Sequence, residues 1–194
     1  MLLIKHRVNS VETLLETPSE LGVEIDVRSW LGEIIINHEP FEEGVSLKSW
    51  LNHFKHKFLI INVKEDGLEK KCLELMEQYK ITNFFFLDQS FPSLNKFVKI
   101  NPNICAVRVS DLEPVETALK LKPGWAWLDS HEGKWSFLSN SITLLKESGI
   151  KSCLVSPELQ RTNSESELQN LNEYLFQNKL QVDAICTKNP SFWK

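Results

Sequence analysis

Short apolar segments alternate with longer amphipathic segments along this chain. The short segments are rich in Ile, Val, Phe or Trp and read as strands: Leu2–His6, Val23–Arg28, Phe58–Lys64, Phe84–Asp88, Cys105–Ser110, Trp125–Asp129, Lys151–Ser156 and Val182–Thr187. The segments between them have helical spacing: Ser10–Glu16, Ser46–His56, Leu68–Tyr79, Ser93–Val98, Glu113–Lys120, Ser139–Glu147 and Ser164–Asn178. A further strand, Glu33–His38, can form a hairpin with the second one. Strands that alternate with helices favour a parallel α/β sheet.

The number of strands decides between two architectures. Eight strands in 194 residues leave about 24 residues for each strand–helix unit. A strand of ~5 residues, a helix of ~11 and two loops of ~4 fill that length. We therefore predict a compact (β/α)8 TIM barrel that forms a single domain over residues 1–194. The rival is an open doubly wound sheet with a glycine-rich phosphate loop, but the chain has only 7 glycines and no GxGxxG motif.

Charge and composition exclude several classes of protein. The net charge is −4 and no basic patch is visible, which argues against a nucleic-acid partner. No apolar run reaches the ~18 residues of a spanning helix, and Lys5 and His6 interrupt the only apolar stretch that could begin a signal peptide. The four cysteines have no CxxC or zinc spacing and read as buried apolar residues. We expect a cytoplasmic protein without a membrane span.

Ionisable residues gather where the predicted strands end, which is where TIM barrels carry their functional groups. Glu24, Asp26 and Arg28 point to one side of their strand because side chains alternate. Buried carboxylates need a cation, and two of them at i and i+2 can anchor Mg²⁺ or Ca²⁺. Histidines His6 and His38 lie at other strand ends and could act as acid and base. An inert ion network inside the barrel mouth is the alternative.

The ordered set of motifs resembles the glycerophosphodiester phosphodiesterases, in the phosphatidylinositol-specific phospholipase C-like superfamily. That family has HRG, then ExDV, then HD, then a helix start T-L-x-E-x-L and a strand E-I-K. Here the matching segments are His6-Arg7, Glu24-x-Asp26-x-Arg28, His38-Glu39, Ser46–Leu51 and Asn62-Val63-Lys64, followed near the end of the sequence by Val182–Pro190 in place of V-D-G-I-I-T-D-x-P. The resemblance covers the whole chain and implies a TIM barrel, a hydrolase activity and a place in lipid metabolism.

The resemblance also implies roles for individual residues. His6 and His38 correspond to the two catalytic histidines, and Arg7 and Lys64 to cations that bind the phosphate. Glu24, Asp26 and Asn62 correspond to the metal ligands, so the implied cofactor is Mg²⁺ or Ca²⁺ and the implied substrate a small phosphodiester. For His6 and Arg7 to reach one phosphate, the chain must leave strand geometry at His6.

Three positions depart from the family pattern. Val8 replaces a glycine, Glu39 replaces an aspartate, and Asn62 replaces a metal-binding glutamate. The amide oxygen of Asn62 can ligate a hard cation but brings no charge, so Asp88 or Asp129 could supply the missing carboxylate. Metal-assisted hydrolysis of a phosphodiester is the leading hypothesis. The alternative is a non-catalytic barrel that binds a phosphorylated metabolite or a partner protein.

Overall fold

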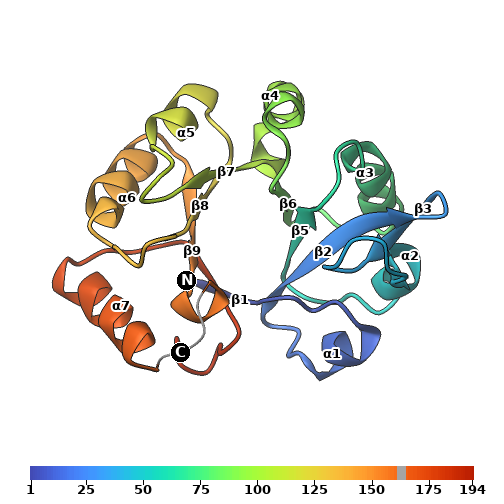
Figure 1. The fold of residues 1–194 in the computed structure, drawn as a ribbon, viewed down its shortest axis with the longest axis horizontal. Helices are drawn as coiled ribbons and strands as arrows, with labels where there is room; N and C mark the ends of the chain where they lie inside the picture. Colours follow the sequence, from blue (N-terminus) through green and yellow to red (C-terminus); the bar gives the residue numbers. More distant parts are fainter. Residues whose placement is uncertain (161–164) are drawn as a thin grey trace.

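Parallel strands curl around a common axis, with the helices outside them (Figure 1). The computed structural model describes residues 1–160 and 165–194. The parallel strands are β1 (Leu2–Lys5), β2 (Gly22–Trp30), β5 (Phe58–Val63), β6 (Phe84–Leu87), β7 (Ala106–Val109), β8 (Trp125–Leu128), β9 (Lys151–Val155) and β10 (Ala184–Thr187). Each of them coincides with a segment predicted from apolar periodicity, which confirms the α/β class.

Strand pairing makes the sheet TIM-barrel-like. β1 pairs with both β2 and β10, and the ladder continues through β9 and β8 to β7. On the other side β2 pairs with β5, and β5 with β6. Between β6 and β7 the described residues form a single parallel bridge, from Phe86 to Cys105. The sheet is therefore continuous from β7 through β1 to β6, and its two outer strands meet through that one bridge.

A hairpin extends β2 beyond the other strands. β3 (Glu33–Ile36) runs antiparallel to β2, and the short β4 (Val45–Ser46) runs antiparallel to β3. The turn uses Leu31 and Gly32, both with positive φ. The hairpin expected over Glu33–His38 is therefore confirmed, and it carries His38 just past its end.

Helices cover the outside of the sheet (Figure 1), and residues 1–160 and 165–194 contain seven α-helices. They are α1 (Val11–Glu16), α2 (Leu47–Leu51), α3 (Glu69–Gln78), α4 (Phe91–Ile100), α5 (Glu116–Leu121), α6 (Phe137–Glu147) and α7 (Glu165–Gln177). Helix α2 ends earlier than expected for Ser46–His56. After the helix, the backbone N–H of Lys57 donates to the carbonyls of Ser19 and Leu21 as the chain enters β5. Ser164, the expected start of the last helix, lies outside the described residues.

Apolar side chains fill two regions, one on each face of the curled sheet. The larger cluster lies between the strands and the helices and includes Leu14, Val23, Ile25, Trp50 and Ile61. The smaller cluster lines the inside of the curled sheet: Ile4, Ile60, Phe85, Leu87, Ala106, Trp125, Trp127, Cys153, Val155, Ala184 and Cys186. Glu24 and Asp26 alternate with the outward-facing Val23 and Ile25, so their side chains belong to the inner face.

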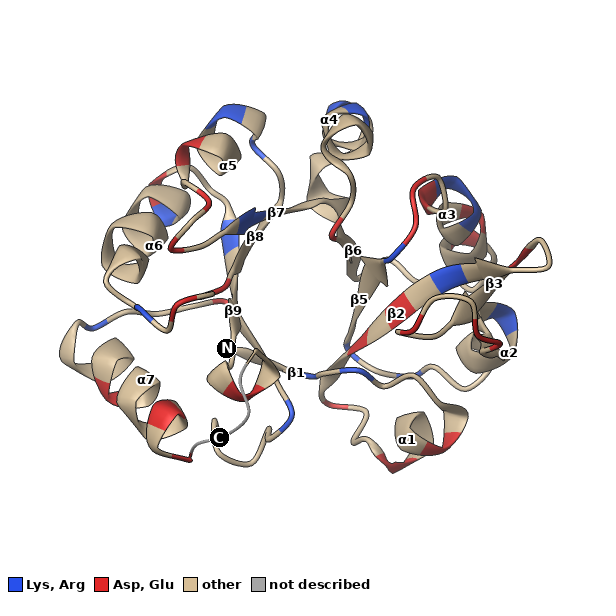
Figure 2. Cartoon of the chain, in the orientation of Figure 1, with Lys and Arg blue, Asp and Glu red and all other residues tan. Residues whose placement is uncertain are grey.

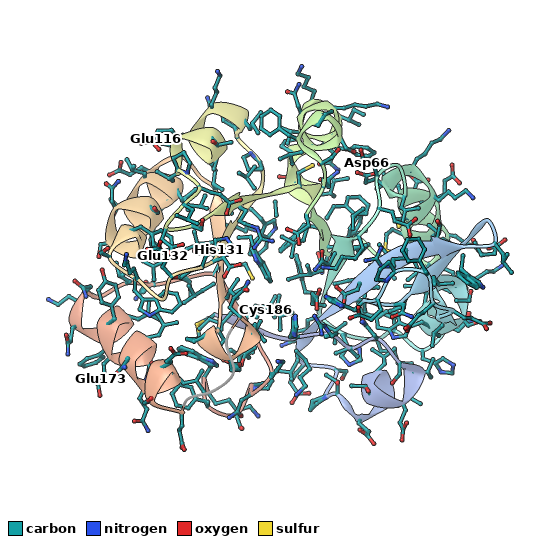
Figure 3. The ribbon with its side chains drawn as sticks, in the orientation of Figure 1. Asp66, Glu116, His131, Glu132, Glu173 and Cys186 are labelled. Atoms are coloured by element: carbon teal, nitrogen blue, oxygen red, sulfur yellow. The ribbon has the colours of Figure 1, made fainter. Side chains whose placement is uncertain are left out.

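The cysteines are structural. All four are free and buried. Burial, together with the charge of the nearby Glu69, raises the pKa of the Cys72 thiol to about 12, and the same two causes raise the pKa of Cys105 to about 12. Figure 3 labels Cys186 near the axis of the curled sheet, in the inner cluster.

Among the described helices, none is long and apolar enough to cross a membrane.

Candidate active site at the ends of β1, β2 and β5

The chain turns sharply after β1. Strand pairing ends at Lys5, His6 still donates its backbone N–H to Thr187, and Arg7 adopts a left-handed backbone with φ 54°. This confirms that strand geometry ends at His6. The following Val8 is fully buried and bonds through its backbone to Glu24 and to the indole N–H of Trp50. The left-handed residue is thus Arg7, and Val8 takes the glycine position as a packing residue.

Glu24 is buried at the centre of this site. Its Oε2 accepts the backbone N–H of Arg7 at 2.7 Å and lies 3.7 Å from Nε2 of His6. Its Oε1 accepts the amide N–H of Asn62 at 3.2 Å. Burial raises the pKa of Glu24 above its usual range, and the neighbouring Asp26 adds to the effect. The carboxyl group therefore gains from any cation brought close to it.

Asp26 is also buried and has a partner on every side. Lys64 Nζ lies 3.3 Å from its Oδ1, and Arg7 Nε lies 3.5 Å from its Oδ2. Asn9 donates its amide N–H to Oδ2 at 2.9 Å and accepts the backbone N–H of Asp26 at 3.0 Å. Asn9 was not predicted from the sequence. It follows β1 by a few residues, and only the fold shows that it faces β2.

His6 and His38 have contrasting surroundings. Burial lowers the pKa of His6 to about 4, and the Arg7 guanidinium lowers it as well, so the ring is neutral at pH 7. His38 is half-exposed, and its Nδ1 lies 2.6 Å from Oε1 of Glu39. That hydrogen bond lowers the pKa of Glu39, with a smaller contribution from the charge of Arg7.

Backbone and side-chain contacts tie the His38 segment to β2. Asn37 donates its backbone N–H to the Asp26 carbonyl at 3.0 Å. Arg28 donates from Nε and Nη2 to the His38 carbonyl, at 3.1 and 3.0 Å, and from Nη1 to the Lys64 carbonyl. The hydrogen bond of the His38 imidazole itself goes to Glu39. Arg28 therefore holds the hairpin against the end of β5.

A second ionic cluster lies across the curled sheet, around Arg108 of β7. Figure 2 shows acidic and basic segments along β2 and a basic segment on β7, on opposite sides of the central axis. Arg108 pairs with Asp88 and with Asp129. Gln160 donates to Asp129 at 2.6 Å. Asp88 and Asp129, considered as substitute ligands, are instead held here. His131 lies in the loop after β8 (Figure 3), 3.5 Å from Glu113.

The oxygen atoms around Glu24 are of the kinds that bind hard cations such as Mg²⁺ and Ca²⁺. They comprise two carboxylates and the Oδ1 of Asn62, which is buried and has no hydrogen-bond partner. Among the described residues, no three His, Cys, Asp or Glu side chains form a metal-binding group. A cation at this place thus depends on the amide oxygen of Asn62, and the two carboxylates already face Arg7 and Lys64.

Comparison with known proteins gives matches in structure alone. No protein-family model and no curated protein sequence matches the chain. A glycerophosphoryl diester phosphodiesterase from Parabacteroides distasonis superposes with a TM-score of 0.71 at 15% identity, over 98% of this chain and 84% of that one. A glycerophosphodiester phosphodiesterase from Thermotoga maritima gives a TM-score of 0.64 at 16% identity, over 100% and 96%. Another from Parabacteroides distasonis gives 0.69 at 14%, over 97% and 93%.

These similarities span nearly the whole chain and agree with the family that the ordered sequence motifs resemble. The similarities show the fold of the chain. The chain has the TIM-barrel-like fold of the glycerophosphodiester phosphodiesterases, and the resemblance found in its sequence is confirmed at that level.

Proposed function

We propose that this protein hydrolyses a phosphodiester of the glycerophosphodiester type at the carboxyl ends of β1, β2 and β5. The observation that carries the proposal is the meeting of His6, Glu24 and Asp26 with the two cations Arg7 and Lys64. Charged groups of both signs at one partly buried place can bind a phosphate, neutralise the charge that develops on it and move protons.

Arg7 and Lys64 are the phosphate-binding residues in this proposal. The Arg7 side chain is 45% exposed, so its guanidinium can reach a ligand in solvent while Nε stays near Asp26. The carboxylate of Asp26 forms an ion pair with each of the two cations. An arginine that offers two parallel N–H groups matches the geometry of a phosphoryl group.

We assign the base to His6 and the acid to His38. His6 is neutral at pH 7, so its Nε2 can accept the proton of an attacking hydroxyl group as the new P–O bond forms. Glu39 holds Nδ1 of His38 and leaves Nε2 to protonate the departing alcohol oxygen as the old P–O bond breaks. The attacking hydroxyl belongs to water or to the substrate itself.

A divalent cation, Mg²⁺ or Ca²⁺, fits this proposal as a cofactor. Glu24, Asp26 and Asn62 would hold it, with the unpartnered Oδ1 of Asn62 as the group that most needs a partner. When bound, the cation supplies further neutralisation of the phosphoryl charge. Binding also offsets the cost of burying ionised Glu24.

The proposed scaffold is a (β/α)8 barrel in which the Phe86–Cys105 bridge joins β6 to β7. The inner cluster supports this, since Phe85 of β6, Ala106 of β7 and Trp125 of β8 belong to one apolar group. Slow exchange of the Phe86 amide in native-state hydrogen exchange would support the proposal, and exchange as fast as in a loop would contradict it.

A non-catalytic barrel that binds a phosphorylated metabolite or a partner protein is the second candidate. Two observations favour it: the amide Asn62 in place of a third carboxylate, and the saturation of Asp26 by Lys64, Arg7 and Asn9.

Hydrolysis of bis(p-nitrophenyl) phosphate and of glycerophosphodiesters, measured with each divalent cation, separates the two candidates. The hydrolase requires activity that His6→Ala abolishes, and loss of activity with chelator supports the cation. His53→Ala, at an exposed position, is the matched control. Binding of a phosphate monoester without turnover of any diester would establish the binding protein instead.

A further inference from the structure

A cavity of about 450 Å³ opens beside the candidate active site, between the amino end of α4 and the loop that precedes α5. It lies where β6 and β7 share only the Phe86–Cys105 bridge. Phe91, Leu94 and Leu112 give it an apolar lining, and Asp88 and Arg108 form its polar end. The cavity combines an apolar surface with a small number of polar groups, as ligand-binding clefts do.

Two large apolar side chains are left exposed on its rim. Phe91 is 60% exposed and Leu112 is 65% exposed. Single exposed apolar residues are ordinary on a protein surface. These two, however, line one cavity from two different elements, at the end of the sheet that carries the candidate active site.

Hydrogen bonds hold both sides of the rim in place. On the Leu112 side, Ser110 Oγ accepts the backbone N–H groups of Leu112 and Glu113, at 3.1 and 2.9 Å. On the Phe91 side, Ser90 caps α4, and Ser93 hydroxyl donates to the buried Glu69. The rim is therefore preorganised, which lowers the entropic cost of binding an apolar group there.

The cavity and the site lie at the ends of neighbouring strands. Asn62 of β5 pairs in register with Leu87 of β6, and Asp88 follows Leu87 directly. One end of the cavity thus begins a single strand away from Asn62 and Lys64. Two carboxylates, Asp88 and Glu113, line the cavity with the single cation Arg108, so a second anionic group would be repelled.

We propose that this cavity, the α4–α5 groove, binds an extended apolar chain on one of the two alcohols of the phosphodiester. The inference rests on the proposed function and narrows its substrate class: the phosphate lies at Arg7 and Lys64, and the chain runs over Asp88 toward Phe91 and Leu112. An alkyl chain gains up to ~0.8 kcal/mol for each buried methylene, about a fourfold gain in binding.

The test uses a homologous series of p-nitrophenyl phosphodiesters whose second alcohol is methanol, butanol or octanol. Each is assayed as a monomer by release of p-nitrophenolate. The unmodified protein should gain about tenfold or more in kcat/KM from methyl to octyl, and Phe91→Ala/Leu112→Ala should lose that gain. Ile100→Ala is the matched control, because Ile100 is 66% exposed at the other end of the same helix and does not line the groove.

A rate that does not depend on chain length, or an unchanged dependence in the double variant, would overturn the groove assignment. Absence of hydrolysis across the whole series would instead refute the proposed activity. In that event, calorimetric titration with octyl phosphate and methyl phosphate still decides the groove. Tighter binding of octyl phosphate that disappears in the double variant supports it, and equal binding of the two ligands overturns it.

Discussion

The backbone amide of Arg7 donates a hydrogen bond to Glu24, and Arg7 itself has a left-handed backbone. The N···Oε2 distance is 2.7 Å and φ is 54°. One residue therefore stabilises Glu24 through its backbone and approaches Asp26 through its guanidinium. A left-handed non-glycine residue costs about 1 kcal/mol or more, a cost commonly found at functional sites.

Arg7→Gly separates these two roles. Glycine adopts positive φ without strain and keeps the amide that bonds to Glu24, so the free energy of unfolding in urea should change by no more than about 1 kcal/mol. Loss of the guanidinium should weaken binding of glycerol 3-phosphate about tenfold or more in calorimetric titration. Arg7→Ala loses the same charge but keeps the strain, so it should be the less stable variant. Unchanged ligand affinity in both would remove Arg7 from the site.

Asn62 offers a direct test of the proposed cation site. Asn62→Glu adds a carboxylate beside Glu24, and the added charge should tighten Mg²⁺ or Ca²⁺ binding several-fold in calorimetric titration. Glu24→Gln and Asp26→Asn should weaken it. Glu33→Gln, on the exposed hairpin, is the control for a general loss of charge. If none of the three site variants changes cation affinity, the cation does not bind there.

The lowered pKa of His6 predicts how the stability of the protein depends on pH when a chelator keeps it free of divalent cations. The pKa falls from 6.5 to about 4 on folding, so the unfolded chain binds more protons between these values and stability rises with pH across that window. The contribution is at most about 3 kcal/mol. Glu24 acts in the opposite sense, since its raised pKa makes stability fall as pH increases.

His6→Gln isolates the contribution of His6. The difference in unfolding free energy between the unmodified protein and this variant should grow from pH 4 to pH 6.5 and then stay constant. His53→Gln, an exposed position, should show no such trend. A difference that does not vary with pH would contradict the burial of His6.

Burial makes the cysteines a probe of the fold. Thiol reagents react with the thiolate, and burial raises the pKa of Cys72 and Cys105 to about 12. At pH 8 the native protein should therefore resist a thiol-specific disulfide reagent, and all four cysteines should react in guanidinium chloride. Rapid reaction of any cysteine in the native protein would contradict its position in the core.

The strands could be predicted from the sequence, but the side-chain contacts between the ends of the strands could not. Period-two apolar patterns located β1, β2 and β5, because each buried face repeats every second residue. The same alternation put Glu24 and Asp26 on one face. The left-handed Arg7 and the bond from Asn9 to Asp26 depend on how the loop after β1 crosses β2. The partners of Arg108, Asp88 and Asp129, follow the strands on either side of β7, and only the register of those strands brings the three together.

His38 is the more exposed of the two proposed catalytic histidines. Its Nδ1 lies 2.6 Å from Glu39, so the carboxylate orients the ring and Nε2 remains available to a leaving group. His38→Ala should lower kcat toward a glycerophosphodiester about 10²–10⁴-fold, the usual contribution of a general acid, and should leave the unfolding transition unchanged. The plot of kcat/KM against pH should lose its basic limb, because no acid remains to be deprotonated.

Glu39→Gln tests the orienting role separately. The amide keeps the size of the side chain but loses its charge, so the rate should fall less than in His38→Ala, and combining the two changes should cost no more than His38→Ala alone. Glu42→Gln, on the exposed loop that follows, is the matched control. A leaving group of low pKa, such as p-nitrophenolate, needs little protonation, so His38→Ala should affect its release far less than release of glycerol. Equal losses with both leaving groups would show that His38 acts in binding and is not the acid.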